Sequence, residues 1–331
     1  MSPGAPGAAQ TARLTRSSSQ APRHFLSVLD RSADEWLALI NRAGALKHVR
    51  PIGGPHPALL SGRTLALIFQ KPSLRTRVSF EVAMLQAGGH ALYLSPAEIQ
   101  LGQREGIADA ARVLSRYVDA IAARVYLHRD VEALARDATV PVINALSDRE
   151  HPCQALADLL TLTEHRGSLR GLRLAYVGDG NNVASSLALA ATRLGVQVTI
   201  ASPDGFEVPP EVLEAAHEGA GLGGTVETFR NPRDAVRGAD VVYTDAWYSM
   251  GQEDEAEVRQ PLFRAYQVNQ TLLHSADPNV LVMHDLPAHR GQEITDDVMD
   301  GPHSIIYDQA ENRLHAQKAL LVDLLERRAS V

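Results

Sequence analysis

The sequence has little cysteine, no long apolar run and no excess of basic residues, and each shortage excludes a class of protein. Cys153 is the single cysteine among 331 residues, so no disulfide can form within the chain, and this usage fits the reducing cytoplasm. No run approaches the roughly 18 apolar residues that span a bilayer, and the N-terminus has no signal-peptide core, so we expect a cytoplasmic protein without a membrane partner. The net charge of −7 argues against a nucleic-acid partner.

What is present predicts two α/β domains. Hydrophobic residues make up 45% of the chain, enough for two cores, and residues 1–22 have the composition of a disordered tail. Apolar segments alternate with amphipathic ones, which is typical of parallel sheets covered by helices. We expect strands at 64–69, 90–94, 120–125, 141–146, 172–178, 197–202, 240–247, 280–286 and 304–308. Helices are expected between them, at 78–88, 107–117, 131–138, 154–167, 185–194, 210–218, 232–237 and 295–299.

This rhythm favours two doubly wound parallel-sheet domains linked by helices, with the active site in the cleft between them. Such sheets place ligands beyond the carboxyl ends of their strands. We predict one domain over 23–150 and a second over 151–310, linked by the helix that the segment HPCQALADLLTLTEHRG carries and that Gly167 ends. An amphipathic helix over 311–331 should pack back onto the first domain.

The stretch FQKPSLRTRVSFE, residues 69–81, predicts an anion site. Ser73, Arg75, Thr76 and Arg77 lie between an apolar strand and a helix, so they should surround a helix N-terminus. Free N–H groups and the positive end of the helix dipole favour phosphate there, and hydroxyl and guanidinium groups add donors. Taken alone, the pattern also fits a simple N-cap at Ser73 with solvated arginines.

Two other motifs suggest cofactor sites and fail on inspection. GDGNN, residues 178–182, follows a strand, but Val183 stands where a dinucleotide-binding loop needs its third glycine, and no ribose-binding acid ends the next strand. His151 and Cys153 do not predict a zinc site, because the chain has no second cysteine and no H-E-x-x-H pattern. In contrast, DAWYSMG, residues 245–251, offers an acid for an ammonium group and donors for a carboxylate, the groups that an α-amino acid needs.

Five ordered motifs together resemble the aspartate/ornithine transcarbamylase family. They are SLRTR, HPCQALADLLT, DAWYSMG, HDLPAHRG and AENRLHAQKALL, and the last three resemble its ornithine-specific members. The resemblance runs from about His24 to the C-terminus. Two positions depart from the usual family pattern: Leu74 replaces a threonine, and Asp285 replaces a cysteine to which the family gives a catalytic role.

The resemblance implies transfer of a carbamoyl group from carbamoyl phosphate to the δ-amine of L-ornithine, without metal or organic cofactor. It implies a homotrimer with shared sites, in which Gln100 reaches a neighbouring subunit. Catalytic roles are implied for Asp285, Arg75, His151 and Arg313. Carbamoyl phosphate contacts are implied for Ser73, Leu74, Arg75, Thr76, Gln100, Arg124, His151, Gln154, Asp285, Leu286 and Arg313. Ornithine contacts are implied for Asn182, Asp245, Ser249 and Met250.

Asp285 leaves alternatives open. A carboxylate about 4 Å from the ornithine ammonium would raise the amine pKa by roughly 3 units at an effective dielectric near 20, which helps binding and hinders nucleophilic attack. Asp285 must therefore accept the proton, turn away, or indicate another amine such as putrescine or an acylated ornithine. Asp245 disfavours both of these amines, since neither has a free α-ammonium. A catalytically silent binding subunit is the remaining alternative, which the intact motifs disfavour.

Overall fold

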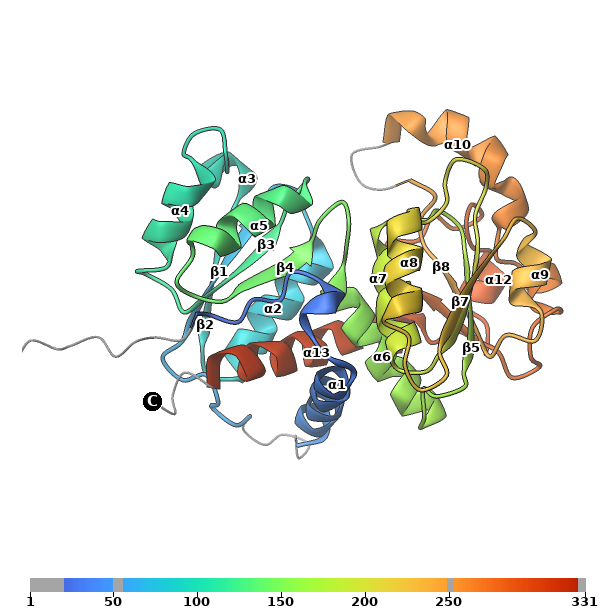
Figure 1. The fold of residues 1–331 in the computed structure, drawn as a ribbon, viewed down its shortest axis with the longest axis horizontal. Coiled ribbons are helices and arrows are strands. Elements are labelled where there is room, and N and C mark those ends of the chain that lie inside the picture. Colours follow the sequence, from blue (N-terminus) through green and yellow to red (C-terminus); the bar gives the residue numbers. More distant parts are fainter. Residues whose placement is uncertain (1–20, 50–55, 249–252, 327–331) are drawn as a thin grey trace, which may run out of the picture.

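Two parallel sheets form the centres of two α/β units in the computed structural model, which describes residues 21–49, 56–248 and 253–326. The first sheet has the order β2-β1-β3-β4 and the second β7-β6-β5-β8-β9, with every pair parallel. The predicted fold class is thus confirmed (Figure 1). The strands are β1 Thr64–Phe69, β2 His90–Leu94, β3 Ala120–Arg124, β4 Val142–Leu146, β5 Arg173–Val177, β6 Gln197–Ala201, β7 Thr225–Phe229, β8 Val241–Thr244 and β9 Leu281–His284.

Helices cover both faces of each sheet, which is why the central strands are apolar almost throughout. They are α1 Ala33–His48, α2 Leu74–Gln86, α3 Pro96–Ile99, α4 Ile107–Leu114, α5 His128–Asp137, α6 Pro152–Arg166, α7 Asn182–Arg193, α8 Pro210–Glu218, α9 Pro232–Val236, α10 Ala256–Phe263, α11 Gln270–Leu273, α12 Asp296–Met299 and α13 Ile306–Glu326. Short 3-10 helices span η1 Val28–Asp30, η2 Glu253–Glu255 and η3 Arg264–Tyr266. None of the helices in the described ranges is both long and apolar enough to cross a bilayer.

The long helices α6 and α13 join the two units. Every residue of α6 from Pro152 to Leu162 is buried, and α13 packs against α1, α2 and α6 (Figure 1). The chain therefore returns to the first unit after building the second. We propose a domain boundary between residues 150 and 151, with the segment from residue 311 onwards belonging to the first domain. The packing of α13 on α1 and α2 supports this assignment.

Local sequence explains where the two helices beside the cleft begin. The Ser73 hydroxyl accepts a hydrogen bond from the Thr76 N–H at 3.3 Å and caps α2. Asn181 caps α7 in the same way, because its Oδ1 accepts from the N–H groups of Val183 and Ala184. Each cap stands in a short turn after a strand, so both helix N-termini lie at the carboxyl end of a sheet.

The strand predicted at 304–308 is wrong, and the strand β7 was not predicted. Only Ser304 pairs with Val282, in a single bridge, and the helix α13 begins at Ile306. Ile305 and Ile306 are buried at this helix start, which explains the apolar run without a strand. The five residues of β7, TVETF, are mostly polar because β7 is an edge strand with one partner.

Gly180 permits a close approach of two backbone segments, and we expect Gly180→Ala to destabilise the protein. A Cβ at this position would lie 2.2 Å from the Val208 nitrogen and 2.3 Å from the Glu207 carbonyl carbon. The two backbone segments must move apart to relieve this overlap, and this shift should lower the free energy of unfolding by about 2 kcal/mol, measured by thermal or urea unfolding. Gly44→Ala in α1 is the matched control: its Cβ would meet only a Leu160 methyl group at 3.9 Å, and helix propensity should raise stability by about 1 kcal/mol. Equal midpoints for Gly180→Ala and the wild type would contradict the close approach.

Candidate active site

A cavity of about 550 Å³ lies where the carboxyl ends of the two sheets face each other. Its lining comes from the turn before α2, the ends of β3 and β4, the start of α6, the loops after β5, β8 and β9, and α13. Segments that are far apart in the sequence thus meet at one place. Of the predicted site residues, the cavity is lined by Ser73, Arg75, Thr76, Arg124, His151, Asn182, Asp245, Asp285, Leu286 and Arg313.

One side of the cavity is basic. Arg75 lies on the first turn of α2, Arg124 ends β3, and Arg313 belongs to α13. Burial is the main reason that the pKa of Arg124 falls to about 10, and Arg313 and Arg75 lower it further, so the group stays charged at neutral pH. Among the described residues, none of these three guanidinium groups forms an ion pair with a carboxylate. Such a set can neutralise an anion.

His151 adds a neutral donor at the same end of the cavity. Burial, followed by the charges of Arg313 and Arg124, lowers the pKa of the imidazole well below its usual range. The backbone N–H of His151 donates to the Ser186 hydroxyl at 2.8 Å, which fixes the residue at the start of α6. A neutral imidazole can donate one hydrogen bond to a carbonyl oxygen without adding charge.

The opposite side of the cavity is acidic. Asp245 follows β8, and its two oxygens accept from the Asn181 amide at 2.7 Å and from the Ala246 N–H at 2.6 Å. Carboxyl oxygens of Asp245 and Asp285 and a ring nitrogen of His284 all lie within 4.8 Å of one another. Burial, and next the charge of Asp245, raises the pKa of Asp285 well above its usual range. This pair therefore attracts ammonium groups and can take up a proton.

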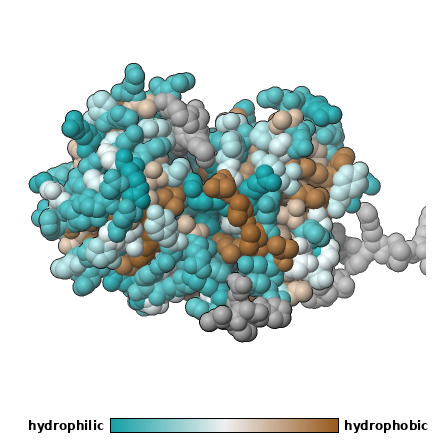
Figure 2. Space-filling view, turned by 180° about the vertical axis from the view of Figure 1, so that it is seen from behind, coloured by the Kyte–Doolittle hydropathy of each residue, from teal (hydrophilic) through white to brown (hydrophobic). Residues whose placement is uncertain are grey.

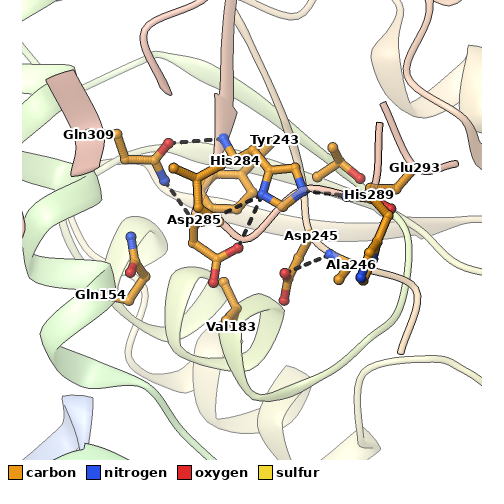
Figure 3. A network of polar contacts seen from close by, with 12 residues as sticks. Gln154, Val183, Tyr243, Asp245, Ala246, His284, Asp285, His289, Glu293 and Gln309 are labelled. Atoms are coloured by element: carbon orange, nitrogen blue, oxygen red, sulfur yellow. Dashed lines mark hydrogen bonds and ion pairs between the residues drawn. The ribbon is translucent and has the colours of Figure 1, made fainter. Parts of the chain in front are cut away.

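His284 fixes the loop that carries Asp285. Its Nδ1 accepts from the Leu286 N–H at 2.9 Å and therefore carries no hydrogen. Its Nε2 is then the nitrogen that donates, to Glu293 at 3.1 Å (Figure 3). The same Nδ1 lies 3.6 Å from Asp285 Oδ1. Glu293 also accepts from the His289 N–H and so closes the loop on itself. The histidine supports Asp285 without contacting the cavity.

Three of the predicted residues do not line the cavity. Gln154 lies fully buried behind it, where it accepts from Arg313. Leu74 is exposed at the start of α2, and Gln100 is exposed after α3. Ser249 and Met250 fall outside the described residues.

Sequence reasoning missed Asp179, Asn181, Tyr248 and His289, which also line the cavity. Asp179 and Asn181 lie in the GDGNN turn, so their place after a strand was the available signal. Arg259 from α10 donates to Asp179 at 2.9 Å, yet burial still raises the pKa of this carboxyl to about 6. Asn182, in contrast, donates to the Ser147 carbonyl oxygen at 2.6 Å and thus ties the second unit to the first.

Comparisons with known proteins agree with this arrangement. Residues 23–164 match the carbamoyl-P binding domain of aspartate/ornithine carbamoyltransferase, and residues 170–324 match its Asp/Orn binding domain. The anabolic ornithine carbamoyltransferase of Pyrococcus furiosus is 57% identical over 304 residues, which cover 92% of this chain and 96% of that protein.

Solved structures give the same picture. The ornithine carbamoyltransferase structure from Pyrococcus furiosus superposes with a TM-score of 0.88 at 57% identity, covering 91% of this chain and 96% of that one. The structure from Thermus thermophilus gives a TM-score of 0.83 at 45% identity, with 92% and 100% coverage. An N-acetyl-L-ornithine transcarbamylase mutant complexed with PALAO gives 0.81 at 35% identity, with 91% and 99% coverage.

Two neighbouring arginines should differ in their effect on phosphate binding, because only one of them lines the basic side of the cavity. We expect Arg75→Ala to weaken binding of inorganic phosphate by about tenfold to a hundredfold, as for a lost charge-assisted hydrogen bond, measured by isothermal titration calorimetry. Arg77→Ala is the matched control: Arg77 lies two residues on, is not among the residues that line the cavity, and pairs with Glu81 at 2.9 Å. Equal losses in the two variants would mean that only general surface charge attracts the anion.

Proposed function

This chain belongs to the aspartate/ornithine carbamoyltransferase family, and from that premise we propose how its cleft transfers the carbamoyl group of carbamoyl phosphate to the δ-amine of L-ornithine. The products are L-citrulline and phosphate. One observation carries the proposal: a basic helix start and an acidic pair face each other across a single cavity. The first suits a phosphate dianion, and the second suits a diamino acid.

The donor lies at the basic side. Ser73, the backbone of Leu74, and Arg75 hold the phosphate at the N-terminus of α2, with Arg124 beside them. Thr76, His151 and Arg313 surround the carbonyl oxygen, where donors stabilise the negative charge of the tetrahedral intermediate. The Leu286 backbone closes this end. Carbamoyl phosphate is already activated, so these residues contribute mainly by orientation and by electrostatics.

The acceptor lies at the acidic side. Asp245 holds the α-ammonium of ornithine, Asn182 contacts the amino acid, and the loop around Ser249 and Met250 closes over it. Asp285 accepts a proton from the δ-ammonium. The freed lone pair attacks the carbamoyl carbon, a C–N bond forms, the C–O bond to phosphate breaks, and the second amine proton leaves with the departing phosphate. The raised pKa of Asp285 suits a group that must take a proton from an amine.

Ornithine is favoured over the other acceptors by Asp245 and by the curated relatives. The relatives at 52–57% identity are named ornithine carbamoyltransferases. An N-acylated ornithine or putrescine would leave Asp245 without an α-ammonium in a half-buried position, which costs desolvation free energy. A silent binding subunit is disfavoured because donor and acceptor groups of the required kinds line one cavity.

We further propose a cytoplasmic homotrimer with shared sites. Gln100 is exposed after α3 and does not line its own cavity, as a residue that serves a neighbouring subunit would be placed. Exposed apolar residues on α2 and β2 offer a surface for a second copy, namely Leu74, Val78, Leu85 and Leu92. Figure 2 shows apolar surface gathered on the side of the molecule opposite to that in Figure 1. The buried single cysteine fits a reducing compartment.

Asp285→Asn tests the proton acceptor. We expect ornithine binding within about tenfold of the wild type, because Asp245 still holds the α-ammonium, and turnover lower by roughly 100-fold or more. The wild-type rate should rise as the pH passes the raised pKa of Asp285, since only the ionised carboxylate accepts a proton. In the variant that rise disappears, and the rate instead climbs steeply towards the amine pKa of about 10. Steady-state citrulline formation between about pH 6 and pH 10 measures both.

Two results decide between the roles of Asp285. Weaker affinity with unchanged or faster turnover would mean that the carboxylate only attracts the ammonium. Unchanged constants would remove Asp285 from the mechanism. Asp285→Cys, which carries the usual residue of the family, is the matched control for folding, and we expect it to keep measurable turnover.

Mixing two inactive variants tests the shared site. If Gln100 completes a neighbouring cavity, Gln100→Ala and Arg124→Ala each inactivate the protein, and mixed oligomers contain some cavities with both residues intact. We expect partial recovery of citrulline formation after subunit exchange. Native mass spectrometry should verify the exchange, and a mixture of two Arg124→Ala preparations is the control. Exchange without recovery would place Gln100 outside the site.

A further inference from the structure

A fully buried carboxylate, Asp158 of α6, lies behind the donor end of the cavity and outside its lining. Its Oδ1 accepts from Gln154 Nε2 and from Gln309 Nε2, both at 2.8 Å. Its Oδ2 accepts from the Tyr243 hydroxyl at 3.2 Å. An ionised carboxylate only accepts hydrogen bonds, so these three donors from α6, α13 and β8 satisfy it.

The carboxylate determines how both glutamine amides are turned. Because each amide presents its nitrogen to Asp158, each carbonyl oxygen points away from it. The Gln154 oxygen accepts from Arg313 Nη1. The Gln309 oxygen accepts from the backbone N–H of His284 at 2.9 Å, one residue before Asp285 (Figure 3).

Two lines of hydrogen bonds therefore start from Asp158 and end on opposite sides of the cleft. Through Gln154 and Arg313 the first reaches the Thr76 hydroxyl, to which Arg313 Nη2 donates at 3.1 Å. Through Gln309 the second reaches the end of β9, just before the loop of Asp285. Tyr243 closes the arrangement, since its hydroxyl also accepts from Gln309 at 3.0 Å.

We propose that Asp158 is a positioning residue for carbamoyl transfer: it fixes the orientation of the Gln154 and Gln309 amides and thereby aligns Arg313 with the acceptor loop. The inference rests on the proposed function of the cleft. Burial raises the pKa of Asp158 to about 7, and the bonds from Gln154 and Gln309 and the charge of Arg313 oppose that rise. A carboxyl group is costly to bury, so its acceptor oxygens must be used.

The proposal predicts a larger effect on rate than on donor affinity. The phosphate group is held by the start of α2 and by Arg124, which Asp158 does not contact, whereas Arg313 faces the carbonyl oxygen whose charge grows in the transition state. Asp158→Asn keeps the shape but adds an amide donor, so either glutamine can turn. We expect kcat to fall about 10- to 100-fold, while the Kd of carbamoyl phosphate without acceptor changes less than about threefold.

Thr161→Val is the matched control on the same helix. Thr161 is also fully buried, one turn along α6. It accepts from Asn312 of α13 at 2.9 Å and donates to the Ala157 carbonyl oxygen at 2.7 Å, and within the described residues it has no hydrogen bond to Arg313. This variant should unfold at a lower temperature and keep kcat within about twofold of the wild type. An equal fall of kcat in Thr161→Val and Asp158→Asn would overturn the proposal, because the effect would then be general to the helix.

Tyr243→Phe supplies a second test of the role of Asp158, which applies even if the Asp158→Asn variant does not fold. It removes one donor to the carboxylate and keeps the ring, so kcat should fall about 3- to 10-fold at nearly constant Kd for carbamoyl phosphate. Wild-type kcat in both variants, or in Tyr243→Phe alone where Asp158→Asn does not fold, overturns the proposal. If the wild-type protein forms no citrulline, the proposed function is wrong instead. In that case a crystal structure of Asp158→Asn still tests the inference: Arg313 should have moved from Thr76, and an unmoved Arg313 overturns it.

Discussion

The hydrogen bonds of the buried Arg313 guanidinium hold the site together. A guanidinium group that loses water must find acceptors within the protein, and Arg313 finds them on α2 and α6. These acceptors belong to the start of α2 in the first unit and to the helix that leads into the second. The packing of α13 against α1, α2 and α6 is therefore part of the chemistry as well as of the core.

The positions of these elements also separate positive from negative charge across the cleft. Arginines from the first unit and α13 face carboxylates from the second unit, without direct ion pairs between Arg75, Arg124 or Arg313 and an acid in the described ranges. The arginines are thus left to meet an anionic substrate group, and the carboxylates a cationic one. In the proposed function, a phosphate dianion and a diamino acid are drawn to opposite walls of one cavity, with the carbamoyl carbon and the amine between them.

Asp285 changes the acidic wall relative to the usual family pattern. With a cysteine at this position, Asp245 would carry the negative charge of the pair alone. Here two carboxyl groups lie close together in a buried position, so they cannot both ionise easily. In the proposed mechanism the arriving ammonium relieves that repulsion, so binding of the acceptor and uptake of its proton become linked. His284 and Glu293 hold the loop that makes this contact possible.

The sequence by itself determined the elements and the chemical classes of the site. The alternation of apolar and amphipathic runs predicted the two parallel sheets, and SLRTR after a strand predicted the basic helix start, because both signals are local. The edge strand β7 and the helical start at Ile306 were not predicted, since edge position and core burial depend on distant neighbours. The same limit hid Asp158: its partners Tyr243 and Gln309 lie 85 and 151 residues away in the chain. Only the tertiary structure decided that Gln154 stands behind the cavity and that one buried carboxylate turns two amides, because hydrogen-bond polarity is set by contacts that no local pattern records.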